Sequence, residues 1–243
     1  MGEGASPAGA GAARAASASA ALAGAALVAA LEREFATVVE DVAVGETSFS
    51  ILRPAEPEAL IDEDAFAHDE RLPYWADVWP STRVLAARLL AHDGRGRTLL
   101  ELGCGSGVAA VAAARAGFDV TATDYYADAL RFTEANVWRA TGSACATRLV
   151  DWRALPRDLG YFDVVAASDV LYERPYAALV ARAIAGSLAR GGVAYVTDPG
   201  RIAAPAFVEA AGALGLDVRP PERDVIDANG TRQTIDTYGL RRR

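Results

Sequence analysis

The sequence contains no lysine: all 24 basic residues among its 243 residues are arginines. They face 32 acidic residues, so the formal net charge is −8. Such an acidic chain is a poor candidate for non-specific binding to nucleic acid or to an anionic membrane surface. We therefore expect neither partner, and the charge balance favours a cationic substrate.

Cysteine and histidine are also scarce, with Cys104, Cys145, His68 and His92 as the complete set. The sequence has no Cys-x-x-Cys pair and no Cys/His cluster, which excludes the usual zinc-binding patterns and a disulfide framework. We accordingly expect no metal and a location in the reducing cytoplasm.

A secretory or membrane segment is not expected at the N-terminus. Residues 1–34 are rich in alanine, glycine and serine, and only Arg14 is basic ahead of the apolar part, whereas Glu3 is acidic. Alanine is too weakly apolar for a membrane span, and Glu32 ends the run. The pattern predicts a low-complexity extension that becomes helical towards residues 32–34.

The segment after this extension has the composition of a β-hairpin. Residues 37–44 and 48–52 are strand-like and are separated by a short turn. Residues 54–70 are acidic and contain proline, which predicts an irregular connector with Leu60 and Ile61 packed inwards. The expected organisation is an extension over 1–34, a hairpin and connector over 35–70, and a main domain over 71–243.

In the main domain, apolar strands alternate with amphipathic helices. After an aromatic loop, Ser81 is a candidate N-cap for a helix. Gly191 and Gly192 are expected to end a later helix. Strands are expected near 98–102, 118–123, 146–150, 162–168 and 192–197, and helices near 106–116, 126–140, 175–190 and 203–214. This alternation predicts an α/β fold with a doubly wound, mostly parallel sheet.

A glycine-rich turn joins the first strand of this alternation to its helix. The apolar run 99–102 contains Glu101 and leads into Gly103, Cys104, Gly105, Ser106 and Gly107. Glycine lets backbone N–H groups approach a ligand closely and permits positive φ angles. The next strand ends in Asp124, which is placed to accept hydrogen bonds from ribose hydroxyls. Together these features predict a pocket for an adenosine-containing cofactor.

The spacing of the glycines identifies the kind of cofactor. A dinucleotide fingerprint would place its third glycine at Val108, whereas this turn reads Gly-x-Gly-x-Gly with an acid two residues upstream. It resembles the first motif of class I S-adenosylmethionine-dependent methyltransferases. That resemblance implies a Rossmann-like, seven-stranded sheet, in which residues 234–240 would form the late antiparallel strand, and S-adenosylmethionine as cofactor.

A second polar group follows the fourth strand. In a doubly wound sheet, the residues just beyond the first and fourth strands flank the point where the strand order reverses. Asp169 could orient an amine and stabilise the charge that develops on its nitrogen during methyl transfer, and Tyr172 could accept a second N–H. The alternatives are an N-cap role for Asp169 and a position at the edge of the core for Tyr172. The sequence identifies no general base.

Three segments resemble one particular group within the class I methyltransferases. The aromatic stretch 74–80, the pair Asp151-Trp152 and the pattern Asp169-x-x-Tyr172 are similar to the protein-lysine methyltransferase, or nicotinamide N-methyltransferase-like, group. The resemblance implies Asp169 and Tyr172 as catalytic residues. It implies that the cofactor is bound by Trp79, Glu101, Gly103, Cys104, Gly105, Gly107, Asp124, Asp151, Trp152 and Ser168.

These features predict an N-methyltransferase that acts on a lysine side chain of a protein. One alternative is a small-molecule amine as acceptor. A nucleic-acid amino-methyltransferase is a third possibility, but such enzymes usually have two prolines where this chain has Val170 and Leu171. A catalytically silent cofactor-binding protein and a nicotinamide oxidoreductase are the remaining alternatives. The sequence leaves the oligomeric state open.

Overall fold

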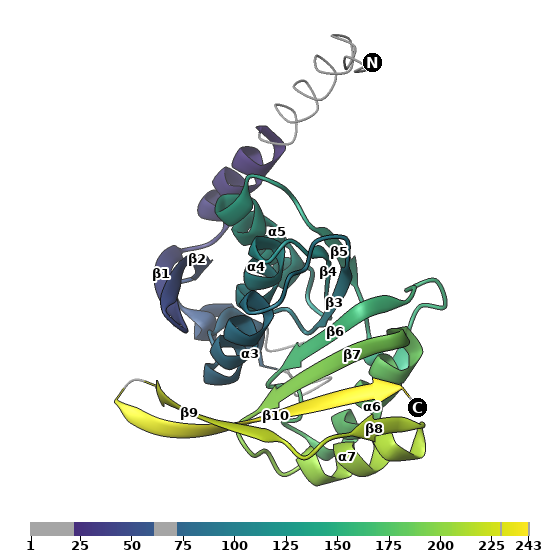
Figure 1. Ribbon diagram of the computed structural model, residues 1–243. Coiled ribbons are helices and arrows are strands. Elements are labelled where there is room, and N and C mark those ends of the chain that lie inside the picture. Colours follow the sequence, from purple (N-terminus) through teal and green to yellow (C-terminus); the bar gives the residue numbers. More distant parts are fainter. Residues whose placement is uncertain (1–21, 61–71, 229, 243) are drawn as a thin grey trace, which may run out of the picture.

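The computed structural model describes residues 22–60, 72–228 and 230–242 (Figure 1). The N-terminal part of the predicted extension and most of the acidic connector, including Ile61, lie outside these residues. Residues 22–34 are helical, so the predicted helix towards residue 34 is present. Leu31 of this helix is fully buried in a cluster with Leu52 and Phe132, which attaches the helix to the main body.

The centre of the molecule is a single twisted sheet with eight strands among the described residues. The strands are β3 (Thr98–Leu102), β4 (Asp119–Asp124), β5 (Ala146–Leu149), β6 (Phe162–Ser168), β7 (Leu188–Asp198), β8 (Leu216–Val218), β9 (Glu222–Ala228) and β10 (Thr231–Arg242). Their order is β5-β4-β3-β6-β7-β10-β8, and β9 pairs with β10. Strands β3 to β7 are parallel to their neighbours, whereas β10 is antiparallel to β7. The predicted α/β class and the late antiparallel strand are confirmed.

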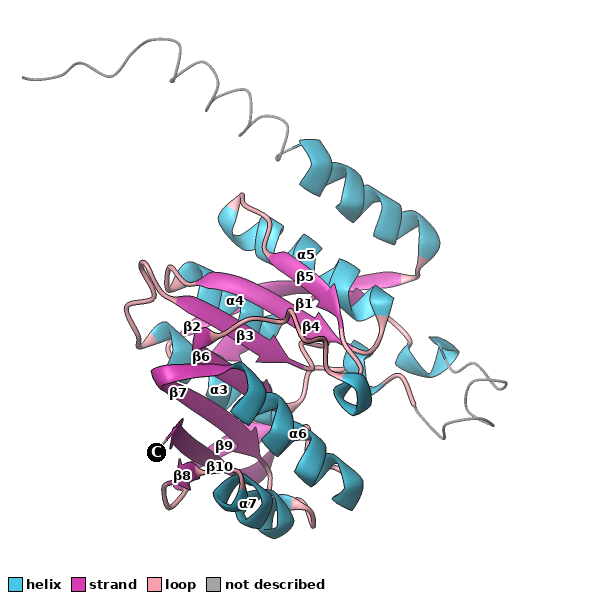
Figure 2. Cartoon of the chain, turned by 90° about the vertical axis from the view of Figure 1, so that its right-hand side faces the viewer, coloured by secondary structure: helices cyan, strands magenta, loops and turns pink. Residues whose placement is uncertain are grey.

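Helices cover both faces of this sheet (Figure 2). The helices are α3 (Pro80–Leu90), α4 (Val108–Arg115), α5 (Ala127–Thr141), α6 (Arg174–Ser187) and α7 (Ala204–Ala213), and the short 3₁₀ turns are η1 (Pro57–Leu60), η2 (Tyr74–Ala76) and η3 (Trp152–Ala154). The first three α-helices pack on one face and the last two on the other. Apart from the boundary between α6 and β7 and the start of β10, which lies three residues before the predicted strand 234–240, the predicted elements of the main domain agree with the observed bounds to within two residues.

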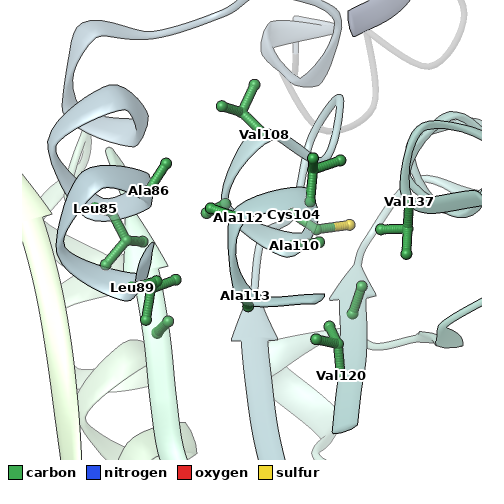
Figure 3. Close-up of a cluster of buried hydrophobic side chains, with 14 of the residues drawn as sticks. Leu85, Ala86, Leu89, Cys104, Val108, Ala110, Ala112, Ala113, Val120 and Val137 are labelled. Atoms are coloured by element: carbon green, nitrogen blue, oxygen red, sulfur yellow. The ribbon is translucent and has the colours of Figure 1, made fainter. Parts of the chain in front are cut away.

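Both faces of the sheet are apolar because its central strands are buried on both sides. Successive side chains of a strand point to opposite faces, so Leu99 packs towards α3 and α4, whereas Leu100 packs towards α6 and α7. Figure 3 shows Ala110, Ala112 and Ala113 of α4 in the first of these clusters. Their small side chains allow α4 to lie close to the sheet, which places the preceding glycine turn at the strand ends.

The predicted β-hairpin is present, with β1 at Thr37–Val44 and β2 at Thr47–Pro54. Its apolar face, with Val42 and Ile51 buried, joins the core cluster beneath α3 and α4. The buried side chain of Asn136 on α5 accepts from the backbone N–H of Leu52 at 2.8 Å and donates to its carbonyl at 2.7 Å. The hairpin is therefore fixed to the main domain by packing and by paired hydrogen bonds.

The expectation that Gly191 and Gly192 end a helix is wrong. Helix α6 ends at Ser187, and β7 begins at Leu188. The two glycines lie inside β7, where the pairing with β6 changes register. Gly191 has a φ of +79°, and a Cβ on Gly192 would lie 2.9 Å from the carbonyl oxygen of Asp163. These glycines therefore allow an irregular strand and close approach of the chains.

Strand β9 was not expected from the sequence. It pairs only with the first half of β10, and together the two strands form an arm that extends beyond the sheet (Figure 1). Arg83 of α3 links this arm to the N-terminal hairpin: it donates to the carbonyl of Ala43 in β1 and to the carbonyl of Asp227 in β9, both at 2.9 Å. One side chain thus connects early and late segments of the chain.

Among the helices of the described residues, none is both long enough and apolar enough to cross a bilayer.

The core beneath α3 generates a test of the packing. Leu89 is fully buried (Figure 3), and we expect Leu89→Ala to lower the free energy of unfolding by about 2–5 kcal/mol, because the substitution removes buried methyl groups and leaves a cavity. Urea unfolding followed by circular dichroism measures this. Leu22→Ala is the control, since Leu22 is 74% exposed. Equal effects of the two substitutions would contradict the assigned core.

Candidate functional site

A cavity of about 390 Å³ lies beyond the carboxyl ends of β3, β4 and β6. This is the place where the strand order reverses and where open α/β sheets bind their ligands, and the volume lies in the usual range for small-molecule sites. Most of the residues predicted for the site line this cavity: Trp79, Gly103, Cys104, Gly105, Asp124, Asp151, Trp152, Ser168, Asp169 and Tyr172. Glu101 and Gly107 do not line it.

The glycine turn forms the floor of the cavity. Gly103 and Gly105 have φ angles of +72° and +54°, which side chains rarely permit. A Cβ on Gly103 would lie 3.4 Å from the ring of Trp152, and one on Gly105 would lie 3.1 Å from the carbonyl oxygen of Trp75. Side chains at these two positions would therefore crowd the walls of the cavity.

Asp124 joins the glycine turn to the loop after β4. One of its carboxylate oxygens accepts from the N–H of Gly105 and the other from the N–H of Tyr126, both at 3.0 Å. The residue is only 6% exposed, and burial raises its pKa, whereas the backbone N–H groups lower it. The carboxylate is thereby held at the tip of β4, on the cavity wall.

Two predicted residues, Glu101 and Gly107, lie outside the cavity wall. Gly107 has a φ of +86°, precedes α4, and would place a Cβ 2.8 Å from the backbone of Thr133. It thus permits close packing of α4 on α5. Glu101 is 1% exposed, and neither of its carboxylate oxygens has a hydrogen-bond partner among the described residues. Burial first, and then the charge of Asp124, raise the pKa of Glu101 well above its ordinary value.

The cavity fits an adenosine-bearing cofactor. The glycine turn leaves space that a Cβ would fill, and the carboxylate of Asp124 lies beside it. Trp152 adds a flat apolar wall, and its Nε1 is buried without a hydrogen-bond partner among the described residues. A bound group with an acceptor atom could satisfy this donor. Cys104, whose pKa burial raises far above the ordinary thiol value, adds a neutral side chain to the same floor.

Asp169 lies on the opposite side of the cavity, directly after β6. It has a φ of +55°, which is unusual for a residue other than glycine. Ser81 donates to one carboxylate oxygen at 3.0 Å, and Nε of Arg201 donates to the other at 2.8 Å. A terminal nitrogen of Arg201 lies 2.7 Å from this second oxygen, so the two side chains form an ion pair. The predicted capping role of Ser81 is therefore wrong: Pro80 begins α3, Trp79 occupies the N-cap position, and Ser81 holds Asp169 instead.

Aromatic rings in contact with one another line the cavity on the side of Tyr172. The ring of Tyr172 lies 6.1 Å from that of Tyr74 and 4.7 Å from that of Tyr176, measured between centroids. Tyr74 contacts Trp79, and Tyr176 contacts Trp152, each at 5.9 Å. These five rings form one chain of contacts, from Trp79 to Trp152, along the cavity wall.

The sequence interpretation missed Arg201, Tyr74 and Tyr176 as residues of the site. Arg201 follows the turn after β7, and β7 is the neighbour of β6 in the sheet. The sequence signal for Arg201 was therefore a charged residue just beyond the carboxyl end of the fifth parallel strand. Tyr176 lies in the first turn of α6, four residues after Tyr172, which precedes the helix. Tyr74 belongs to the aromatic stretch that the resemblance covered, but its own role gave no separate signal.

The fold and the site can now be compared with known proteins. A family model for a methyltransferase domain matches residues 74–217 of this chain. The matched segment contains β3 to β7 and every residue of the predicted site. Among curated proteins, none matches the sequence.

Solved structures with similar folds are methyltransferases. The chain is 20% identical to the ribosomal protein L11 methylase of Lactobacillus delbrueckii subsp. bulgaricus, over 67% of this chain and 79% of that one, with a TM-score of 0.51. It is 16% identical to a proposed RNA methyltransferase of Pyrococcus horikoshii, over 69% of this chain and 86% of that one, with a TM-score of 0.55. It is 17% identical to the magnesium protoporphyrin IX methyltransferase of Synechocystis PCC 6803, which was solved with bound S-adenosylmethionine. This match covers 76% of this chain and 94% of that one, with a TM-score of 0.53. At these identities the likeness establishes a shared fold.

The burial of Glu101 predicts a pH dependence of stability. A folded-state pKa above the ordinary value of 4.5 means that Glu101 ionises first in the unfolded chain, so its contribution to stability is fully present below pH 4.5 and is lost as the pH rises towards the folded pKa. The slope is about 1.4 kcal/mol per pH unit. We expect Glu101→Gln to remove this fall. Urea unfolding at several pH values measures the free energy of unfolding. Glu209→Gln, at an exposed position on α7, is the control. A parallel decline with pH in the wild-type protein and both variants would contradict the prediction.

The position of Asp124 predicts a loss of cofactor affinity on substitution. We expect Asp124→Ala to weaken binding of S-adenosylmethionine by about 1–3 kcal/mol, because polar groups that the carboxylate would pair are left unpaired. Isothermal titration calorimetry measures the dissociation constant. Asp119→Ala, at the exposed opposite end of β4, is the matched control. An unchanged dissociation constant for Asp124→Ala would refute its assignment to the ribose hydroxyls.

Proposed function

Because the chain belongs to the methyltransferase domain family and is an enzyme that uses S-adenosylmethionine, we propose that it methylates an amine nitrogen, and specifically a lysine side chain of a protein. The observation that carries the proposal is the position of Asp169 and Tyr172. Both lie on the wall of the cavity that also contains Gly103, Gly105 and Asp124. A carboxylate and a phenol thus share one cavity with the cofactor residues.

The residues that would hold the cofactor are those around the glycine turn. Backbone groups of Gly103, Cys104 and Gly105 would contact it, Asp124 would bind the ribose hydroxyls, and Trp152 would cover the adenine. S-adenosylmethionine held there would supply an electrophilic methyl group to the amine nitrogen, and the electron pair of the broken C–S bond would stay on its sulfur.

Asp169 and Tyr172 would act on the acceptor. The carboxylate orients the amine and stabilises the positive charge that develops on nitrogen. The phenol oxygen accepts another N–H and limits the directions in which the amine can enter. Proton loss from the ammonium form must precede the transfer, because only the free amine carries a lone pair.

Charge also supports a cationic acceptor. The cavity wall carries five carboxylates and one guanidinium among its described residues: Asp77, Asp124, Asp151, Asp169, Glu173 and Arg201. Such a wall raises the local concentration of cations. Together with the net charge of −8, it favours an amine over a phosphate-bearing substrate, so we propose no nucleic-acid partner. A metabolite amine is the second candidate, since the same carboxylates would bind it.

The absence of lysine gives a direct test of the acceptor. The full chain is incubated with methyl-labelled cofactor and either a lysate of the expression host or poly-L-lysine, and the protein fraction is hydrolysed to amino acids. We expect labelled methyl-lysine. The enzyme itself cannot contribute it, because the chain contains no lysine. Label confined to small molecules would replace the protein acceptor with a metabolite amine, and no label in any fraction would contradict the proposal.

Asp169 can be tested separately from the cofactor residues. We expect Asp169→Asn to reduce turnover by about 100-fold or more, because the developing positive charge loses its carboxylate, while affinity for S-adenosylmethionine stays within about twofold. Asparagine tolerates the positive φ of this position, so the variant should fold. Turnover is measured as labelled methyl-lysine and affinity by calorimetry. Asp217→Asn, exposed on β8, is the control.

A parallel loss of turnover and cofactor affinity in Asp169→Asn would instead make Asp169 a cofactor-binding or structural residue.

A further inference from the structure

Arg201 is held in the acceptor end of the cavity by contacts at both ends of the residue. The buried carboxylate of Asp198 accepts from the backbone N–H groups of Gly200 at 2.8 Å and of Arg201 at 2.6 Å. The guanidinium carbon lies 5.6 Å from the ring centroid of Trp79, and the guanidinium forms an ion pair with Asp169 in which Nε donates a hydrogen bond. Arg201 is thus fixed by its backbone, by an aromatic ring and by an ion pair.

This ion pair leaves Asp169 almost no unused capacity. Its side chain is 5% exposed, whereas that of Arg201 is 34% exposed. An ionised carboxylate has about four lone-pair positions. The hydroxyl of Ser81 and Nε of Arg201 already donate to it, and a terminal nitrogen of Arg201 lies 2.7 Å from one of its oxygens. An acceptor amine that reaches Asp169 therefore meets a carboxylate whose charge is partly compensated.

We propose that Arg201 is a positioning residue that partly compensates the charge of Asp169, so that the acceptor amine is bound as the reactive free base and not as ammonium, while enough negative charge remains to stabilise the charge that develops during transfer. This inference rests on the proposed amine methylation. A carboxylate without a partner would favour the ammonium form of a nearby amine and raise its pKa. The adjacent guanidinium opposes that effect, while Asp169 can still accept one hydrogen bond from the neutral amine.

The arrangement separates attraction of the acceptor from its activation. Asp77 and Glu173 are exposed residues of the cavity wall, and their carboxylates can attract an ammonium group from solution. Asp169 lies deeper and is paired. A lysine side chain would be drawn in as a cation, lose its proton to water at the cavity mouth, and present its lone pair beside Asp169.

Other titratable groups near Asp169 could also contribute to a pH dependence of amine binding. Those that line the wall near Asp169 or interact with it are Asp77, Tyr172, Glu173, Tyr176, Asp198 and Arg201. Burial raises the pKa of Asp198, and this group is unchanged in all variants below. Comparison of Arg201→Met with Arg201→Lys therefore isolates the effect of the charge at position 201.

The experiment uses Nα-acetyl-lysine methylamide, which carries a single amine. Its dissociation constant is measured by calorimetry between pH 7 and pH 10 on the full chain saturated with S-adenosylhomocysteine, and its methylation rate is measured over the same range. We expect the wild-type protein to bind it more tightly as the pH rises. Arg201→Met should bind it about tenfold more tightly than wild type at pH 7 and with a weaker pH dependence, because the ammonium form then pairs with Asp169.

The methylation rates should change in the opposite direction. In Arg201→Met, kcat should fall about tenfold at pH 7 and recover about one pH unit higher than in wild type. If Arg201→Met does not fold, Arg201→Gln should give the same shift of the kcat profile to higher pH. Arg201→Lys should restore the wild-type profile, and Arg182→Met, an exposed position on α6, should leave it unchanged.

Two results would contradict the inference and are distinguishable. If Arg201→Met and Arg201→Gln keep the pH dependence of wild type, Arg201 does not tune the amine, although amine methylation stands. If the wild-type protein binds S-adenosylhomocysteine but neither binds nor methylates the lysine probe at any pH, the proposed acceptor is wrong and the role of Arg201 falls with it.

Discussion

The hydrogen bonds of the Asp124 carboxylate are the contacts on which the geometry of the cavity depends. They tie the N–H of Gly105 in the turn after β3 to the N–H of Tyr126 in the loop after β4. Two loops from neighbouring strands are therefore held by one buried side chain. Because both loops border the cavity, a displacement of this carboxylate would change the floor and one wall together. Gly103 and Gly105 leave the space beside these hydrogen bonds free of side chains.

Much of the fold follows from local sequence patterns. The alternation of apolar strands with amphipathic helices predicts the parallel sheet, since each strand is covered on both faces, and the turn at Gly103 to Gly107 marks the first strand–helix junction. The polar residues after the first, second and fourth strands could be placed at one edge of the sheet because parallel strands end on the same side. That argument predicts that Asp124 and Asp169 face one cavity, and both residues line it.

What the sequence could not predict depends on contacts between distant segments. Ser81 has the composition of a helix cap, yet Pro80 begins the helix and the hydroxyl serves Asp169, 88 positions away. The ion pair of Arg201 with Asp169 spans 32 positions and depends on the pairing of β6 with β7. Gly191 reads as a helix terminator, but tertiary pairing draws this segment into β7. Periodicity carries no information about any of these pairings.

The contacts of Arg83 have a consequence for biosynthesis. This side chain holds β1 and β9 at once, through the carbonyls of Ala43 and Asp227. Synthesis runs from the N-terminus, so the hairpin, α3 and α4 are made before β9 and can pack on one another in its absence. The link through Arg83 to Asp227 cannot form until β9 has been made, so the second anchor of the hairpin is added to a segment that its core contacts can already hold.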